Sequence, residues 1–309
     1  MTGVNKLSYS FARHETFHIR TGWLKKGIDA LDDNKHIFLE TIPAMDKLGI
    51  GKNMISSLRY WLEAVGLTEE GYNNRRQKIQ EKTDLGKNIL KYDKYFEDEA
   101  TFWLLHFNLA SNKKKATSWY WFFNHFNNLE FDKELFIEKL KRYIKRSGEE
   151  PPAQRSLESD FNVLRRMYLY DPEEEIHPES SKVSPFRGLK LIKNEEGKYK
   201  INRPNPNNLP PKILYYCILN NLDSPDVDYV NVEEVLNDEG SVGRIFKLNM
   251  TILHEYLEIL QDLNYLRLDR QAGLNSIKLL KPINEKEDIL KEYYNSKLYY
   301  KESDTSDKE

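Results

Sequence analysis

The stretch LGIGKN, residues 48–53, constrains the fold more than any other feature of the chain, because it separates two segments with helical spacing of apolar residues. The first segment covers residues 42–48 and the second covers 53–65. Gly49 suits a sharp turn between two helices, since glycine adopts backbone conformations that other residues avoid. Ala44 is small enough for the helices to approach closely. The spacing predicts a helix-turn-helix.

The flanking segments extend this pattern into that of a winged helix. A helix is expected over 21–31, and two short segments over 72–92 occupy the place of a β wing. A similar series returns near the C-terminus, with helices expected over 212–220, 232–236 and 250–263 and a strand pair around Ala272-Gly273. We therefore predict a mainly α fold with small β wings, built from tandem winged-helix-like modules.

The predicted boundaries follow changes in composition along the chain. An aromatic, helical segment follows the first module and fits a winged helix or a plain bundle, and a stretch rich in Pro, Glu and Asn follows that segment. The predicted parts are an N-terminal winged-helix-like module (1–95), the helical module (96–170), a linker (171–210) with a small strand pair, a C-terminal winged-helix-like module (211–285), and a C-terminal helix and tail (286–309).

Cysteine usage and hydropathy indicate the compartment. The single cysteine, Cys217, excludes an intramolecular disulfide framework and every cysteine-rich metal site. The sequence has no basic-then-apolar signal and no apolar run near the roughly 20 residues that span a bilayer. We expect a cytoplasmic protein without membrane contact.

Residues 14–18 read His-Glu-Thr-Phe-His and match H-E-x-x-H, a zinc-binding pattern that requires both histidines on one helical face. The alternating apolar residues of 11–19 predict an extended segment instead. Residues four apart would then lie about 13 Å apart, too far to share one zinc ion. We therefore assign no catalytic residue, no metal ligand and no cofactor, and expect Glu15 to organise a buried polar cluster. A metal-dependent hydrolase or nuclease using His14 and Glu15 stays an alternative.

Charge and residue type favour nucleic acid as a partner of the N-terminal half. Residues 1–95 carry a net charge of +4, whereas residues 171–309 carry −7 and would repel phosphates. A recognition helix over 53–65 and its wing would present side chains suited to phosphates and base edges. These candidate DNA-binding residues are Lys52, Asn53, Ser56, Arg59, Tyr60, Arg75 and Arg76. A solvated helix face explains them about equally well.

The two later modules differ in the partners that their charges suit. Basic residues over 139–146 and at 155, 165 and 166 make the helical module another candidate DNA contact, although surface solvation explains any one of them better. The third helix of the C-terminal module would expose His254, Glu255, Glu258 and Asp262, which suits a protein partner, and a homodimer is one option.

FARHETFHIRTGWLKKG, followed by LGIGKNMISSLRYWLEAVGL, resembles the start of a bacterial family, Domain of Unknown Function 4007. RSLESDFNVLRRMYLY and SPFRGLKLI resemble later parts of the same family. The residues of the first block that match the family pattern are His14, Glu15, Thr16, Phe17, Arg20, Trp23, Leu24 and Lys26. The pattern leaves position 18 open, so the second histidine of H-E-x-x-H is not part of it.

The resemblance implies a genomic context and assigns no catalytic residue. Members of the family tend to be encoded near phosphoadenosine-phosphosulfate-reductase-like proteins and in clusters for DNA modification and phage defence, including those that resemble DNA phosphorothioation systems. Together with the charge pattern, this predicts a DNA-binding accessory or specificity subunit that acts with partner proteins on double-stranded DNA. The alternatives are the metal-dependent hydrolase and a purely protein-binding scaffold for a sulfotransfer or nuclease partner.

Overall fold

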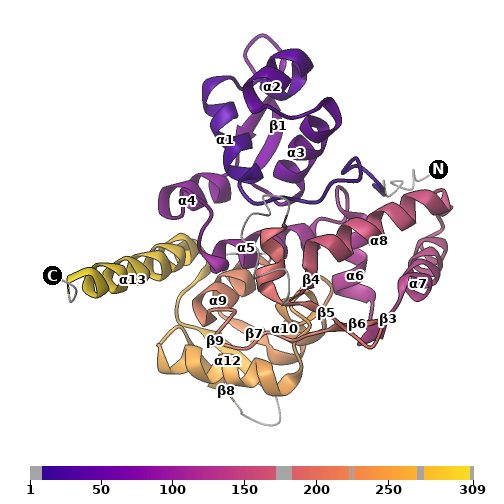
Figure 1. Cartoon of the computed structure of the whole chain (residues 1–309). Coiled ribbons are helices and arrows are strands. Elements are labelled where there is room, and N and C mark those ends of the chain that lie inside the picture. Colours follow the sequence, from indigo (N-terminus) through magenta and orange to yellow (C-terminus); the bar gives the residue numbers. More distant parts are fainter. Residues whose placement is uncertain (1–8, 172–182, 223, 225, 270–274, 307–309) are drawn as a thin grey trace, which may run out of the picture. The chain divides into compact units, whose positions relative to one another are not determined.

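The chain folds into two compact units, each assembled from two separate stretches of sequence. Figure 1 labels the helices and strands. The computed structural model describes residues 9–171, 183–222, 224, 226–269 and 275–306. Unit 1 consists of Met1–Ile89 and Asn108–Asn202, and unit 2 consists of Leu90–Phe107 and Arg203–Glu309. Helix makes up 55% of the structure, so the predicted mainly helical class is confirmed.

The first part of unit 1 contains the two helices predicted on either side of Gly49. Its elements are α1 (Trp23–Asp33), the 3-10 helix η1 (Ile37–Leu39), α2 (Thr41–Leu48), α3 (Lys52–Ala64), β1 (Thr68–Tyr72) and β2 (Lys78–Lys82). Gly49 ends α2 with a φ of 61°, a value that glycine adopts without strain. Gly27 of α1 lies against the side chains of Leu58 and Leu62 of α3, so these two helices cross closely.

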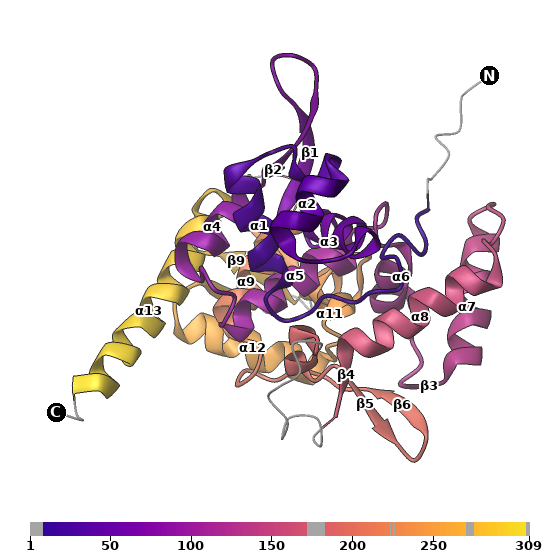
Figure 2. The same cartoon turned by 45° about the horizontal axis from the view of Figure 1, so that its top comes forward.

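The hairpin that follows α3 begins earlier than the sequence predicts. Strands β1 and β2 pair in antiparallel fashion from Thr68↔Lys82 to Tyr72↔Lys78 and project from the three helices (Figure 2). The second segment expected within 72–92 is instead largely α4 (Asp84–Tyr92). Three helices followed by a hairpin fit a winged helix, but that assignment stays a prediction.

The second part of unit 1 combines helices with a four-stranded sheet. Its helices are α6 (Thr117–His125), α7 (Lys133–Arg146) and α8 (Gln154–Tyr168), and α7 and α8 lie side by side in both views (Figures 1 and 2). The sheet has the order β3-β6-β5-β4, from β3 (Glu130–Phe131), β6 (Lys198–Ile201), β5 (Ile192–Glu195) and β4 (Leu169–Tyr170). The predicted strand pair is confirmed as β5–β6. It lies inside a packed sheet and not in an open linker.

Unit 2 contains the predicted C-terminal helices. Its elements are α9 (Pro211–Asn220), β7 (Tyr229–Asn231), α10 (Val232–Asn237), α11 (Val242–Ile245), α12 (Met250–Asp262), β8 (Leu266–Asp269), β9 (Ser276–Leu279), η5 (Ile283–Glu285) and α13 (Lys286–Ser306). Strand β7 joins the expected pair in the order β7-β9-β8, and α11 is an addition. The Ala272-Gly273 turn lies outside the described residues.

The boundaries of the two units cross those of the predicted modules. Helices α4 and α5 (Glu99–Ser111) are each divided between the units, and residues 183–202, expected in the linker, belong to unit 1. The five predicted parts therefore stay a prediction about folding units. Among the helices that the structure describes, none is long and apolar enough to span a bilayer.

Candidate functional site

The H-E-x-x-H segment forms consecutive turns, so the prediction of an extended segment over 11–19 is wrong. Ala12, Glu15 and Thr16 have φ values of 53°, 49° and 66°, and the amide of Phe17 donates to the carbonyl of His14 at 2.8 Å. Extended backbone cannot contain these left-handed residues. The segment is not a helix either, so His14 and His18 lack the one-turn arrangement of a zinc peptidase.

His14 belongs to a buried hydrogen-bond network that joins the N-terminal segment to α8 and α6. The Nδ1 atom accepts from the amide of Thr16 at 3.1 Å, so Nε2 carries the proton and donates to Asp160 Oδ1 at 2.9 Å. Asp160 also accepts from the amide of Ala12 at 2.8 Å and from the hydroxyl of Ser118. A buried carboxylate is stable when its oxygens are satisfied in this way.

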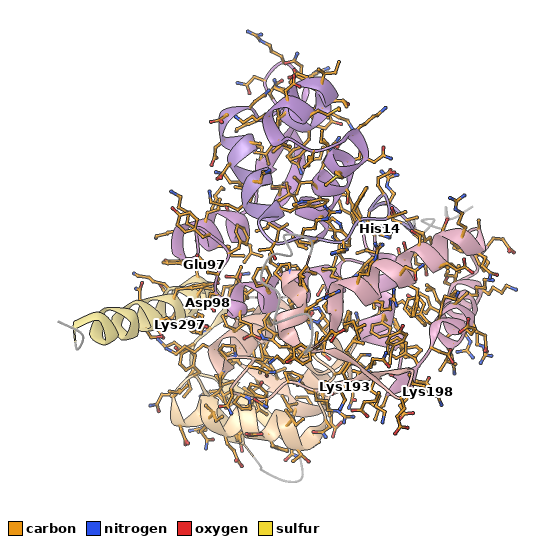
Figure 3. The ribbon with its side chains drawn as sticks, in the orientation of Figure 1. His14, Glu97, Asp98, Lys193, Lys198 and Lys297 are labelled. Atoms are coloured by element: carbon orange, nitrogen blue, oxygen red, sulfur yellow. The ribbon has the colours of Figure 1, made fainter. Side chains whose placement is uncertain are left out.

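Aromatic rings enclose His14, whose position is labelled in Figure 3. Its ring stacks on Trp61 of α3 with centroids 6.0 Å apart and meets Trp119 of α6 edge-on at 5.7 Å. Trp61 Nε1 donates to the carbonyl of Phe17 at 2.9 Å, which fixes the same turn from the other side. Since His14 and Asp160 are 0% and 1% exposed, the network holds three elements together and does not reach solvent.

The network resembles no catalytic triad despite its Ser, His and Asp. The Ser118 hydroxyl donates to Asp160 and not to His14, so the serine lacks the adjacent base that would make it a nucleophile. The organising role expected of Glu15 belongs to Asp160, because the Glu15 side chain is exposed. Lys26 donates to the carbonyl of Leu48 at 3.0 Å and so supports the end of α2.

Four arginines of unit 1 gather next to this turn: Arg20, Arg165, Arg166 and Arg187. Arg166 donates to the carbonyl of Thr16 at 2.7 Å, and Arg187 donates to the carbonyl of Arg166 at 3.2 Å. The Arg20 guanidinium lies 5.6 Å and 5.1 Å from the ring centres of Phe17 and Trp23. The three sequence blocks that carry the family resemblance therefore meet in this arginine cluster.

The guanidiniums of the arginine cluster lie close enough together for their positive charges to repel one another. Burial lowers the pKa of Arg166, and the charges of Arg165 and Arg20 lower it further. Burial also lowers the pKa of Arg187, whereas Asp171 opposes that shift. The Nε atoms of Arg20 and Arg165 are buried without a hydrogen-bond partner among the described residues. Partly buried guanidiniums with unused donors are suited to phosphate, because the planar guanidinium can donate to two phosphate oxygens at once.

The predicted DNA-binding residues of α3 and the hairpin divide into two groups. Lys52, Asn53 and Ser56 are exposed at the start of α3, and Arg75 and Arg76 are exposed at the hairpin tip. Arg59 is half-buried and pairs with Glu70 at 2.7 Å and Glu63 at 3.4 Å. Tyr60 donates inward to the carbonyl of Lys115 at 3.1 Å, and burial raises its pKa, so its hydroxyl does not face solvent.

The charge difference between the halves is larger when it is counted by structural unit. Unit 1 contains 32 basic and 26 acidic residues, a net charge of +6, whereas unit 2 contains 15 and 23, a net charge of −8. In unit 2, Glu255, Glu258 and Asp262 of α12 are exposed as predicted, whereas His254 is half-buried, so its predicted exposure is wrong. Sequence reasoning missed Arg20, Arg165, Arg166 and Arg187 as one group, because they lie up to 167 positions apart. The shared family blocks were the signal that could have linked them.

One family model matches most of the chain, and two solved structures share its fold. The family described as "Protein of unknown function (DUF4007)" matches residues 11–294. The structure described as "SspB crystal structure" is 28% identical, covers 93% of this chain and 88% of that one, and has a TM-score of 0.81. A "Magnesium ion-bound SspB crystal structure" is 27% identical over the same shares, with a TM-score of 0.82. No curated protein sequence matches the chain.

Proposed function

The chain belongs to the DUF4007 family, and from this premise we propose that it is a DNA-binding accessory or specificity subunit of a bacterial DNA-modification or phage-defence system. The likeness to SspB supports a role in such a system and fits the phosphorothioation-associated context. Its partners would be double-stranded DNA and other proteins of the complex. An association with phosphoadenosine-phosphosulfate-reductase-like proteins is part of this proposal.

The arginine cluster is the observation that carries the DNA-binding part of the proposal. Arg166 donates to the turn that the His14 network fixes, and Arg187 donates to the carbonyl of Arg166. The charges of Arg20 and Arg165 act on Arg166, so four guanidiniums from three separate segments lie close together. Surface arginines that serve only solubility need no such support. A prearranged group of guanidiniums binds phosphate with less loss of side-chain entropy. The exposed Lys52, Arg75 and Arg76 would add contacts to the same polyanion.

A salt series with duplex DNA tests this proposal. Each phosphate contact contributes about 0.9 to the slope of log affinity against log salt. We expect Arg165→Gln with Arg187→Gln to lower that slope by about 2 and to weaken binding at low salt. The matched control is Lys114→Gln with Lys198→Gln, which removes the same charge from two exposed positions of unit 1 that belong to no candidate DNA contact. Fluorescence anisotropy measures the affinity, and thermal melting checks that each variant is folded.

Two results would overturn the DNA-binding proposal. One is the absence of duplex binding by the unaltered chain at low salt, which leaves the protein-binding scaffold as the better hypothesis. The other is an equal loss in the control pair, which would mean that net charge and not the arginine cluster is responsible. The pair Lys52→Glu with Arg59→Glu tests the α3 face in the same way.

The metal-dependent alternative finds little support in unit 1. Both ring nitrogens of His14 are engaged and the side chain is fully buried, so it has no free lone pair for a metal. Among the described residues, no group of three or more His, Cys, Asp or Glu side chains is placed to hold an ion. The alternative predicts stoichiometric metal in the purified protein that is lost in His14→Ala.

Magnesium, named for one of the SspB structures, requires carboxylate oxygens that are free to coordinate it. The buried carboxylate of Asp93 accepts from the amides of Glu97 and Asp98 and from the hydroxyl of Thr101. Asp98 pairs with Lys297 at 3.0 Å (Figure 3), and Asp160 is satisfied as described above. These carboxylates do not fit a prepared magnesium site, and we derive no reaction step through the ion.

A further inference from the structure

A second group of cations in unit 1 surrounds a cavity of about 340 Å³ between α6 and α7. Its lining consists of Trp121, His125, Phe126, Asn127, Asn128, Lys139, Arg142, Tyr143 and Arg146. None of these residues belongs to the arginine cluster or to the α3 face. Small-molecule sites are typically about 300–1,000 Å³. The volume therefore suits one small ligand and excludes a duplex.

One wall of the cavity is a cationic stripe on α7. Lys139, Arg142 and Arg146 are three and four positions apart, so they lie on one face of the helix. Arg142 pairs with Glu138 at 2.7 Å, an exposed pair that competes weakly with a ligand. Within the described part of the chain, Lys139 and Arg146 form no ion pair. The stripe thus offers free cations to an anionic group.

The opposite side of the cavity supplies aromatic and amide groups. The rings of His125 and Tyr143 lie 4.8 Å apart at 33°, and both side chains are half-buried. Trp121 and Phe126 pack behind them at 5.4 Å and are almost fully buried. Asn127 and Asn128 are exposed at the rim. Aromatic rings stack on nucleobases, and amides can pair with base edges.

We propose that this cavity binds a single nucleotide, with the phosphate on Lys139 and Arg146 and the base against His125 and Tyr143. A free phosphate would use only the cations, and an apolar peptide side chain would leave Lys139 and Arg146 without an anionic partner. The nucleotide has two sources, a free mononucleotide or one unit of a single-stranded DNA chain, and both present the same base and phosphate. The proposal goes beyond duplex binding and does not depend on the arginine cluster.

The test compares four probes on the full-length chain by titration calorimetry at low salt. They are a deoxynucleoside monophosphate, with each of the four bases tested in turn, inorganic phosphate, a five-nucleotide single-stranded DNA, and the same sequence closed into a hairpin duplex. We expect nucleotide binding that falls at least about tenfold in Lys139→Gln with Arg146→Gln. The control, Lys141→Gln with Lys145→Gln, removes equal charge from another face of the same helix and leaves the affinity unchanged.

A third variant separates base recognition from phosphate recognition. Tyr143→Leu weakens binding of the nucleotide by about tenfold, the usual scale of one stacking contact, and leaves inorganic phosphate unaffected. Binding of monophosphates identifies a free nucleotide as the source, whereas binding of the oligomer alone identifies a single-stranded chain.

Three outcomes overturn the proposal. They are no binding of monophosphate or oligomer, equal losses in the two double variants, and phosphate binding as tight as nucleotide binding with no effect of Tyr143→Leu. The pair Arg165→Gln with Arg187→Gln separates the two proposals. It should weaken duplex binding and leave the affinity of the cavity for a nucleotide unchanged, so either proposal can fail without the other.

Discussion

His106 shows how strongly burial in unit 2 affects a single ionisable side chain. The side chain is fully buried, and its Nε2 donates to the carbonyl of Ile245 at 3.3 Å, which requires a proton on Nε2 in either charge state of the ring. Burial lowers the pKa of His106 to about 3, the bond to Ile245 opposes this shift, and Lys247 adds to it. The folded protein therefore binds this proton much more weakly than the unfolded chain, whose histidines titrate near 6.5.

Acid should consequently destabilise unit 2 through His106. The pKa of His106 is lower in the folded protein than in the unfolded chain. The free energy of unfolding therefore has its full value above about pH 6.5 and decreases as the pH falls towards about 3. Between these values the free energy of unfolding should fall by up to about 1.4 kcal/mol per pH unit. Urea unfolding at a series of pH values measures this slope. His106→Gln, whose amide can still donate to Ile245, should flatten it, and an unchanged slope would contradict the assignment.

The His14 network marks the limit of what the sequence reveals at the scale of residues. The burial of apolar positions such as Trp61 and Ile28 follows from helical spacing, and both are 0% exposed. The partner of His14 does not follow from spacing, because Asp160 lies 146 positions away. Glu15 is nearer in sequence and was the natural choice, yet the left-handed turn places it in solvent. Local patterns predict which residues are buried, and only the tertiary fold decides which of them meet.

At the scale of elements, Gly86 places α4 against the start of the hairpin. A Cβ atom at this position would lie 2.2 Å from the carbonyl oxygen of Leu67, which also accepts from the amide of Thr83. Gly86→Ala should lower the free energy of unfolding by about 1–3 kcal/mol, because the backbone must move to admit the methyl group. Gly188→Ala is the control, since no heavy atom lies within 4 Å of its Cβ position.

Chemical denaturation followed by tryptophan fluorescence measures both glycine variants. The control should stay within about 0.5 kcal/mol of the unaltered chain. Equal stability of the two variants would show that α4 does not pack this closely in solution.

Helices were more predictable than strands because their apolar periodicity is local. The predicted helices over 42–48 and 53–65 correspond to α2 and α3 within one residue. Strands β3 and β4 have two residues each, too short for an alternating pattern. They form only because β5 and β6, far along the chain, provide the sheet that they join. The left-handed turns at 12–16 likewise have no periodic signature.

At the scale of the whole molecule, the two compact units and the five parts predicted from composition divide the chain at different residues. Composition suggests consecutive modules, but unit 2 recruits Leu90–Phe107 from a distant part of the sequence. The same division gives unit 1 a net charge of +6 and unit 2 a net charge of −8. This difference is larger than the one between residues 1–95 and residues 171–309. Long-range attraction of DNA should therefore act on unit 1. The hydrophobic pattern alone could not reveal that residues 90–107 belong to unit 2, because the apolar periodicity of a helix does not depend on which core the helix packs against.

The recruited segment should be required for unit 2 to fold. Trp103 is fully buried, donates to the carbonyl of Asn208 at 2.7 Å, and meets the ring of Phe246 at 5.5 Å. Tyr92 stacks on Tyr294 at 5.5 Å. Without residues 90–107, a fragment of residues 203–309 would expose this core. We expect the fragment alone to melt at a much lower temperature, or without a cooperative transition, because loss of one buried Trp side chain typically costs about 3–5 kcal/mol.

The matched comparison joins residues 90–107 to the start of residues 203–309 through a flexible glycine-serine linker. This fragment should melt cooperatively by circular dichroism, since it contains every segment of unit 2. Trp103→Ala within it should return the melting behaviour of residues 203–309 alone. Equal melting temperatures with and without residues 90–107 would instead mean that the C-terminal module predicted from the sequence folds by itself, and that the segment only packs on a finished core.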